Sequence, residues 1–170
     1  SNKFVIDECE NIHQMMCNDL MDNKVVGIVR GRMEFGPRSL CHRSILYKTS
    51  DKSINDWINK RLNRTEFMPF APVVRDEVAK KCFLDYTDDD VTLNFMTSTI
   101  DCTEEFVKKC PAVCHVDKTA RPQIIKKNTN EFMWYLLKEW EKISGELGLV
   151  NTSFNAHEEP IICNIDQSLE

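Results

Sequence analysis

Three arginines lie in one short loop of a chain that is acidic overall. Residues 31–43 read GRMEFGPRSLCHR and contain Arg32, Arg38 and Arg43 but only one acid, Glu34, whereas the whole chain has a net charge of −5. An arginine guanidinium is planar, permanently charged and able to hold a phosphate or carboxylate through two hydrogen bonds. Any one of these arginines could equally be a surface residue paired with a nearby acid, but the cluster favours an anion-binding site.

A second basic segment, residues 60–72, reads KRLNRTEFMPFAP. Its Lys60 and Arg61 fall at the expected end of a helix, where the helix dipole stabilises cations without any ligand. Arg64 lies beyond the helical pattern and next to Glu66, so it is the better candidate for binding an anion.

Residues 115–121, HVDKTAR, place a histidine, a carboxylate, a hydroxyl and an arginine in one predicted strand–turn–strand unit. A lone His115 is more often a core or turn histidine than a catalyst. With Asp117 and Arg121 so close, it could instead orient its neighbours or carry a proton. His115 and Asp117 are therefore the candidate catalytic residues.

Residues 151–155, NTSFN, supply neutral hydrogen-bond donors and acceptors directly after a predicted strand. Such groups suit carbonyl and amino groups or phosphate oxygens, which makes Asn151 and Ser153 candidate ligand contacts. The triplet NTS is also an N-glycosylation pattern, which a cytoplasmic chain would not use.

The elements that must position these loops alternate between helices and short β-branched strands. This order predicts an α/β layered fold. Three of the polar loops follow strands, where open α/β sheets place their ligands. Helices are expected over residues 7–22, 54–62, 76–84 and 130–145. Strands are expected over residues 25–30, 44–48, 112–116, 123–126 and 147–150, with extended chain over 68–74 and 160–163.

The composition is that of one globular domain of 170 residues, with 42% hydrophobic and 29% charged residues. No apolar run is long enough to span a bilayer and no signal segment follows the N-terminus, so we expect a cytoplasmic chain. Its negative charge argues against nucleic acid and anionic membranes as partners. The eight cysteines show no paired CxxC motifs and are expected to be reduced and mostly buried. No metal is expected, because a closed zinc site needs four ligands.

Four motifs carry a resemblance to a known family. In order, GRMEFGPRSL, FMPFAPV, HVDKTARPQ and NTSFNAHEEPI resemble the C-terminal domain of the carbamoyltransferases that include the nodulation-factor and tobramycin enzymes. The resemblance covers roughly residues 25–170. It implies a three-layer twisted mixed sheet similar to threonylcarbamoyl-adenylate synthases. It also implies that residues 1–170 are one such domain, with a leading helix within 1–22, a truncated C-terminal helix, and an absent N-terminal actin-like domain as partner.

The resemblance further implies a two-step reaction. Carbamoyl phosphate and ATP, both substrates, give carbamoyl adenylate in this domain. The carbamoyl group then passes to an acceptor hydroxyl in the N-terminal domain, which carries a histidine-bound metal. The residues implied to bind carbamoyl phosphate or its adenylate are Arg38, Arg121, Asn151 and Ser153. The motif match assigns Arg64 to the same ligand less specifically. Fixed guanidinium groups can neutralise charge on phosphate oxygens without reorganising.

Some positions depart from the family pattern. Met68 stands where members usually carry arginine, Cys41-His42 replaces a common Gly-Asn, and Lys118 replaces a common glycine. Lys118 would either add positive charge to the site or indicate a backbone of different shape. Two other functions stay open: a noncatalytic nucleotide- or RNA-binding module, and a structural domain closing over the N-terminal partner. The latter predicts that the loop arginines pair with internal carboxylates.

Overall fold

The computed structural model describes residues 4–62, 70–156 and 158–169. Its centre is a five-stranded mixed sheet with strand order β1-β2-β7-β3-β6. Neighbouring strands run antiparallel except β3 and β6, which are parallel. The strands are β1 (Val26–Val29), β2 (Arg43–Lys48), β7 (Gly148–Ser153), β3 (Ala71–Arg75) and β6 (Gln123–Ile125). The predicted α/β mixed sheet is confirmed.

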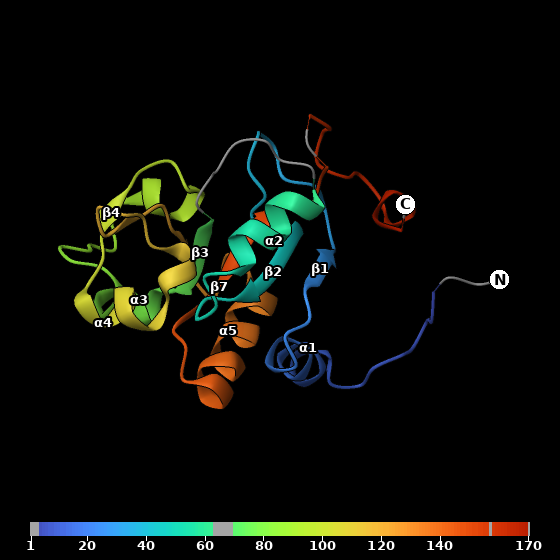
Figure 1. Ribbon diagram of the computed structural model, residues 1–170, viewed down its shortest axis with the longest axis horizontal. Helices are drawn as coiled ribbons and strands as arrows, with labels where there is room; N and C mark the ends of the chain where they lie inside the picture. The colour runs from blue at the N-terminus through green and yellow to red at the C-terminus, as the bar shows by residue number, and fades with distance from the viewer. Residues whose placement is uncertain (1–3, 63–69, 157, 170) are drawn as a thin grey trace.

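Helices cover both faces of this sheet, which makes three layers. Figure 1 shows α1 and α5 running along one side, with α2 on the other side and α3 and α4 beyond β3. The helices are α1 (Ile12–Met21), α2 (Ile54–Arg61), α3 (Asp76–Cys82), α4 (Glu104–Lys109), α5 (Glu131–Ser144) and α6 (Ile165–Ser168). The connection from β3 to β6 also holds two 3-10 turns, η1 (Val91–Phe95) and η2 (Pro111–Val113), and a small second sheet of β4 (Ile100–Asp101) and β5 (Thr119–Ala120). No helix in the described ranges is both long and apolar enough to cross a bilayer.

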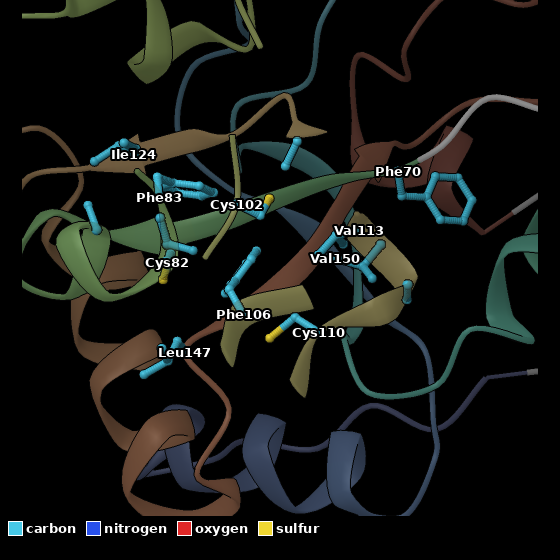
Figure 2. Packing of buried hydrophobic residues seen from close by; sticks show 14 of the residues in the cluster. Phe70, Cys82, Phe83, Cys102, Phe106, Cys110, Val113, Ile124, Leu147 and Val150 are labelled. Carbon is cyan, nitrogen blue, oxygen red and sulfur yellow. The ribbon is translucent and has the colours of Figure 1, made fainter. Parts of the chain in front are cut away.

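The central strands supply two separate hydrophobic cores, because successive side chains of a strand point to opposite faces. Leu46 and Val73 are buried in the core beneath α1 and α5. Their neighbours Ile45 and Val74 are buried in the core shared with α2, α3 and α4. Figure 2 shows the second core, in which cysteine side chains pack among aromatic and aliphatic ones. A sheet buried on both faces explains why adjacent positions of these strands are both apolar.

Helix α5 follows its sequence signals closely. The Asn130 side chain accepts a hydrogen bond from the Met133 N–H at 3.1 Å, as an N-cap should. Gly145 ends the helix at a φ of 75°, in the left-handed region that glycine adopts readily. The apolar stripe buries Met133, Leu136 and Trp140. The predicted helix over 130–145 is confirmed.

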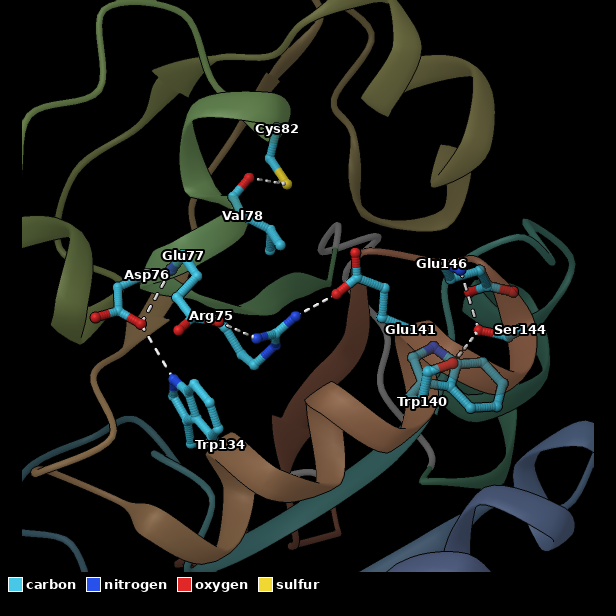
Figure 3. Close-up of polar contacts among 10 residues, drawn as sticks. All are labelled: Arg75, Asp76, Glu77, Val78, Cys82, Trp134, Trp140, Glu141, Ser144 and Glu146. Atoms are coloured by element: carbon cyan, nitrogen blue, oxygen red, sulfur yellow. Dashed lines mark hydrogen bonds and ion pairs between the residues drawn. The ribbon is translucent and has the colours of Figure 1, made fainter.

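A buried arginine joins the end of β3 to α3 and α5 (Figure 3). Arg75 is only 4% exposed. It forms ion pairs with Glu77, at 2.6 Å, and with Glu141. Its guanidinium also lies 5.2 Å from the ring centroid of Trp134, whose indole N–H donates to Asp76 at 3.2 Å. The charge of Arg75 is therefore fully compensated inside the domain.

The prediction of a strand over 112–116 was wrong. These residues form most of η2 and the turn after it. The 3-10 turn η2 begins at Pro111, whose fixed φ suits a helical turn. The Ala112 N–H donates to the Thr49 carbonyl at 3.0 Å instead of joining a ladder. Extended chain at 160–163 also stays outside the sheet, with Ile162 N–H donating to the Phe154 carbonyl at 3.0 Å.

Two helices differ from their predictions. Helix α1 begins at Ile12 and not at residue 7, because the Asn11 side chain caps it by accepting from the Gln14 N–H. Helix α4 was not predicted, although Thr103 caps it by accepting from the Phe106 N–H at 3.2 Å. A single buried residue, Phe106, packs this short helix onto the core, which is too little periodicity to detect.

Candidate functional site

A cavity of about 230 Å³ lies where the loop before β2 meets β3, β5 and the end of β7. The residues that line it are Pro37, Arg38, Ser39, Phe70, Ala71, Met96, Arg121, Asn151, Thr152 and Ser153. We call it the arginine cavity. It brings together four of the residues singled out in the sequence, Arg38, Arg121, Asn151 and Ser153, from three distant segments.

The arginine cavity is positively charged. Arg38 and Arg121 are both half-buried. Burial and the nearby charge of Arg38 lower the pKa of Arg121, in that order of importance. Among the described residues, no carboxylate oxygen lies within 4.0 Å of either guanidinium. Two guanidinium groups that repel each other would both be stabilised by one shared anion.

Asn151 lines the arginine cavity and is only 1% exposed. Its amide nitrogen donates to the Ser39 carbonyl at 3.2 Å and to the Gln123 side-chain oxygen at 2.7 Å. Its Oδ1 has no hydrogen-bond partner among the described residues. A buried acceptor without a partner is uncommon and is suited to a ligand N–H or O–H.

The loop that carries Arg38 is shaped by a carboxylate. Glu34 Oε1 accepts from the backbone N–H groups of Leu40, His42 and Arg43 at 2.7, 2.8 and 3.2 Å. Burial acts to raise the pKa of Glu34, but these backbone donors outweigh it and the pKa is lowered. The single acid of the loop therefore fixes its backbone, and it forms no ion pair with Arg38 among the described residues.

The other two loop arginines do not line the arginine cavity. Arg32 is exposed and borders a larger hollow of about 420 Å³ that Glu34 also lines. Arg43 is buried and donates to four backbone carbonyls, those of Arg30, Gly31, His42 and Cys163. Arg43 holds the C-terminal segment against the loop. Its Nε, Nη1 and Nη2 atoms all donate to these carbonyls and are not available to a ligand.

His115 and Asp117 lie in the turn before β5 and are not among the residues lining the arginine cavity. His115 Nδ1 is 2.8 Å from Thr119 Oγ1, which donates to Asp117 Oδ1 at 2.8 Å. The backbone N–H and hydroxyl of Thr119 lower the pKa of Asp117. The three side chains bind one another and shape the turn that leads to Arg121. Arg64 and Met68 lie outside the described residues.

Two departures from the family pattern fall at left-handed backbone positions. Cys41 has a φ of 72° and Lys118 a φ of 65°, in the region where glycine is least strained. The backbone therefore keeps the shape that glycine would allow. Lys118 is exposed and is not among the residues lining the arginine cavity, so its charge is not added there. Cys41 is buried, with its Sγ 3.2 Å from Gln123 Oε1.

Sequence reasoning missed three residues of the site. Gln123 accepts a hydrogen bond from the Asn151 side chain, and its polar side chain at the start of an otherwise apolar strand could have indicated this role. Ser39 supports the Arg38 loop through its hydroxyl, 2.6 Å from that of Ser44. Met96 lines the arginine cavity from a left-handed residue after η1, which no local pattern indicates. Within the described ranges, no group of three or more histidine, cysteine or acidic side chains is placed to hold a metal ion.

The fold is a mixed α/β domain, and two arginines line one of its cavities. Residues 17–170 match the family Carbamoyltransferase C-terminus, and the chain belongs to that family.

Known relatives agree with this membership. The chain is 40% identical over 167 residues to the uncharacterized protein MJ1051 of Methanocaldococcus jannaschii, covering 95% of this chain and 31% of that protein. It is 35% identical over 161 residues to the nodulation protein NolNO of Sinorhizobium fredii, covering 94% and 24%. The chain thus spans a quarter to a third of these relatives, which contain further domains.

The fold is shared with part of a larger solved structure. Full-length HypF, crystallised in a phosphate- and nucleotide-bound form, superposes with a TM-score of 0.64 at 19% identity, over 97% of this chain and 20% of that one. The HypF of T. kodakarensis gives a TM-score of 0.61 at 14% identity. These likenesses establish the fold.

Proposed function

We propose that this domain binds carbamoyl phosphate and ATP in and beside the arginine cavity and forms carbamoyl adenylate for transfer to an acceptor hydroxyl. The observation that carries the proposal is the convergence of Arg38, Arg121, Asn151 and Ser153 on one cavity. Family membership supports the carbamoyl chemistry, and the phosphate- and nucleotide-bound form of HypF supports the ligand class.

The cavity chemistry matches carbamoyl phosphate group by group. The guanidinium groups of Arg38 and Arg121 compensate the charge of the phosphate oxygens, and the phosphate in turn relieves their mutual repulsion. The free Oδ1 of Asn151 accepts a hydrogen bond from the carbamoyl amino group. A volume of about 230 Å³ suits a small phosphorylated molecule. ATP would then extend beyond this cavity.

His115 and Asp117 act in this proposal by positioning and not by proton transfer. Their hydrogen bonds through Thr119 fix the turn that sets the direction of Arg121. Arg64 is kept as a further phosphate ligand. The acceptor and any histidine-bound metal are assigned to the remainder of a longer polypeptide, with an actin-like N-terminal domain as partner, because the relatives are three to four times as long.

Calorimetric titration of the chain with carbamoyl phosphate tests the proposal. Arg121→Ala should abolish or strongly weaken binding, because the dianion loses a charged hydrogen-bond partner. Arg61→Ala is the matched control, since Arg61 is exposed at the end of α2 and is not among the residues lining the arginine cavity. Equal affinity of Arg121→Ala and the parent chain, or no binding by either, would refute the proposal.

The structural alternative predicts a different environment for the arginines. It requires Arg38 and Arg121 to pair with internal carboxylates, as Arg75 does, but none lies within ion-pair distance of them among the described residues. The net charge of −5 argues against the RNA-binding alternative, because such binding depends on attraction to the phosphate backbone. Filter retention of RNA at low salt would revive it.

A further inference from the structure

Cysteines gather in the core beneath the small β4–β5 sheet. Cys82, Cys102 and Cys110 are buried there among Phe83, Phe106 and their neighbours, as Figure 2 shows. Cys114 packs against the same core. The Sγ atoms of Cys102 and Cys114 are 3.8 Å apart, and both cysteines are free thiols. Nothing in the proposed carbamoyl chemistry uses this pair.

The two thiols of the pair differ in reactivity. Cys114 is half-buried, whereas Cys102 is only 5% exposed. The hydrogen bond with Cys114 and burial raise the pKa of Cys102. An oxidant therefore reaches the more exposed Cys114 first, and Cys102 is placed to react second.

The remaining core thiols are poor competitors. Burial raises the pKa of Cys110 to about 12 and also raises that of Cys82. The Cys82 thiol donates to the Val78 carbonyl at 3.3 Å, as Figure 3 shows. Buried, protonated thiols react slowly with oxidants, so oxidation is directed to Cys114.

We infer that Cys102 and Cys114 are an oxidation site at which a small peroxide forms a reversible disulfide that adjusts the arginine cavity. In the first step the Cys114 thiolate attacks one oxygen of hydrogen peroxide, giving a sulfenic acid and hydroxide. In the second step the Cys102 sulfur attacks the sulfenic acid sulfur. The proton of the Cys102 thiol and the departing hydroxyl leave as water. Two thiol sulfurs are oxidised by two electrons in total, and the peroxide is reduced.

The link to the arginine cavity runs through the turn between Cys114 and β5. A disulfide would bring the two sulfurs from 3.8 Å to about 2.0 Å. The Cys102 N–H already donates to the Lys118 carbonyl at 2.9 Å, and β5 pairs with β4 through Thr119 and Asp101. Arg121 follows β5 directly. Drawing Cys114 towards Cys102 therefore shifts the turn that orients Arg121. This regulatory half of the inference rests on the proposed function.

Peptide mapping after peroxide treatment tests the disulfide itself. The full chain is used with Cys9→Ser and Cys163→Ser, which remove the two exposed thiols. Limited hydrogen peroxide should lower the intact mass by two hydrogens and give a cross-linked peptide joining Cys102 and Cys114. Dithiothreitol should reverse both changes. Cys114→Ser should prevent them, and Cys102→Ala should leave a trappable sulfenic acid at Cys114. A stable sulfenic acid in the unsubstituted pair, or a cross-link between other cysteines, would overturn the inference.

Titration of the reduced and oxidised forms with carbamoyl phosphate tests the coupling. Oxidation should weaken binding by about tenfold, because displacements near 1 Å have large effects on positioned charges. Peroxide-treated Cys114→Ser should bind like the reduced chain. A mapped disulfide with equal affinity in both forms would overturn the regulatory half. No binding by the reduced chain would count against the proposed function, while the mass measurement would still decide on the disulfide.

Discussion

Two arginines of this domain, Arg75 and Arg121, lie in opposite electrostatic environments. Arg75 is buried between the carboxylates of Glu77 and Glu141 and lies over the Trp134 ring. Arg121 is half-buried, and this burial together with the nearby charge of Arg38 lowers its pKa. The domain therefore compensates one guanidinium internally and leaves the other without a carboxylate partner among the described residues.

This difference separates a structural from a ligand-binding arginine better than burial or sequence does. Arg43 shows why, because it lies in the candidate loop and yet donates to four carbonyls. An arginine whose donors are used by the protein contributes to stability. An arginine held near another positive charge costs stability in the free protein, and this cost is relieved when an anion binds.

The largest expected effect is on stability, at Arg75. Arg75→Ala should lower the free energy of unfolding by about 3 kcal/mol, because it removes two charged hydrogen bonds and leaves a cavity where the buried side chain lay over Trp134. Carbamoyl phosphate affinity of the folded fraction should be unchanged. Urea denaturation measures the first quantity and calorimetry the second. A parallel loss of affinity would show that the two arginines are not independent.

Arg38→Ala should weaken ligand binding and leave stability almost unchanged, the reverse of Arg75→Ala. Loss of a charged hydrogen bond to phosphate corresponds to about 2 kcal/mol, or about thirtyfold weaker binding of carbamoyl phosphate. Stability without ligand should be unchanged or slightly higher, since Arg121 loses a repulsive neighbour. Arg61→Ala is again the control. Marked destabilisation by Arg38→Ala would place Arg38 with Arg75 as a structural residue.

Glu34→Gln should reduce stability by about 1 kcal/mol at neutral pH, because backbone donors bind a carboxylate more strongly than an amide. The pKa of Glu34 is lower in the folded chain than its ordinary 4.5. Its contribution is therefore fully present above about pH 4.5 and is lost as the pH falls through the lowered value. Denaturation of the variant and the parent from pH 7 to pH 3 should show the difference shrinking. A constant difference would mean that the charge of Glu34 is unimportant.

The smallest effect is expected at Lys118. Lys118→Gly should raise stability by roughly 0.5–1 kcal/mol, because it removes strain at a φ of 65°. Lys52→Gly is the matched control, since Lys52 is also an exposed turn lysine but is not among the residues with positive φ. It should be neutral or slightly destabilising. Carbamoyl phosphate affinity should be unchanged by Lys118→Gly, and a large loss would return Lys118 to the ligand site.

Sequence patterns predicted those parts of the fold that are encoded locally. The N-cap Asn130 and the terminal Gly145 define α5, and apolar runs identify the strands of the central sheet. Helix α4 and the 3-10 turn η2 were not predicted because they are short and are held by contacts with distant residues, such as Ala112 with Thr49. Local propensity contains no information about such contacts.

The candidate site was predictable in residue type but not in arrangement. Residue types indicated the polar binding segments, and the family resemblance implied Arg38, Arg121, Asn151 and Ser153 within them, which line one cavity. Asn151 and Ser153 were expected directly after a strand but lie within β7. Residue type alone could not distinguish Arg38 from Arg43, because their difference lies in which carbonyls fold back to meet the side chain. His115 was also ambiguous, since its partner Thr119 lies within the turn.

The parallel pairing of β3 and β6 has a consequence for the order in which the domain folds. These strands are joined by residues 76–122, and the cavity needs Arg121 from the end of that connection and Asn151 from β7. Contacts between distant segments form late, after the entropy of closing a long loop has been overcome. During refolding, helix signals should therefore recover before the capacity to take up carbamoyl phosphate. A chain caught between these stages would be compact but unable to bind the proposed ligand.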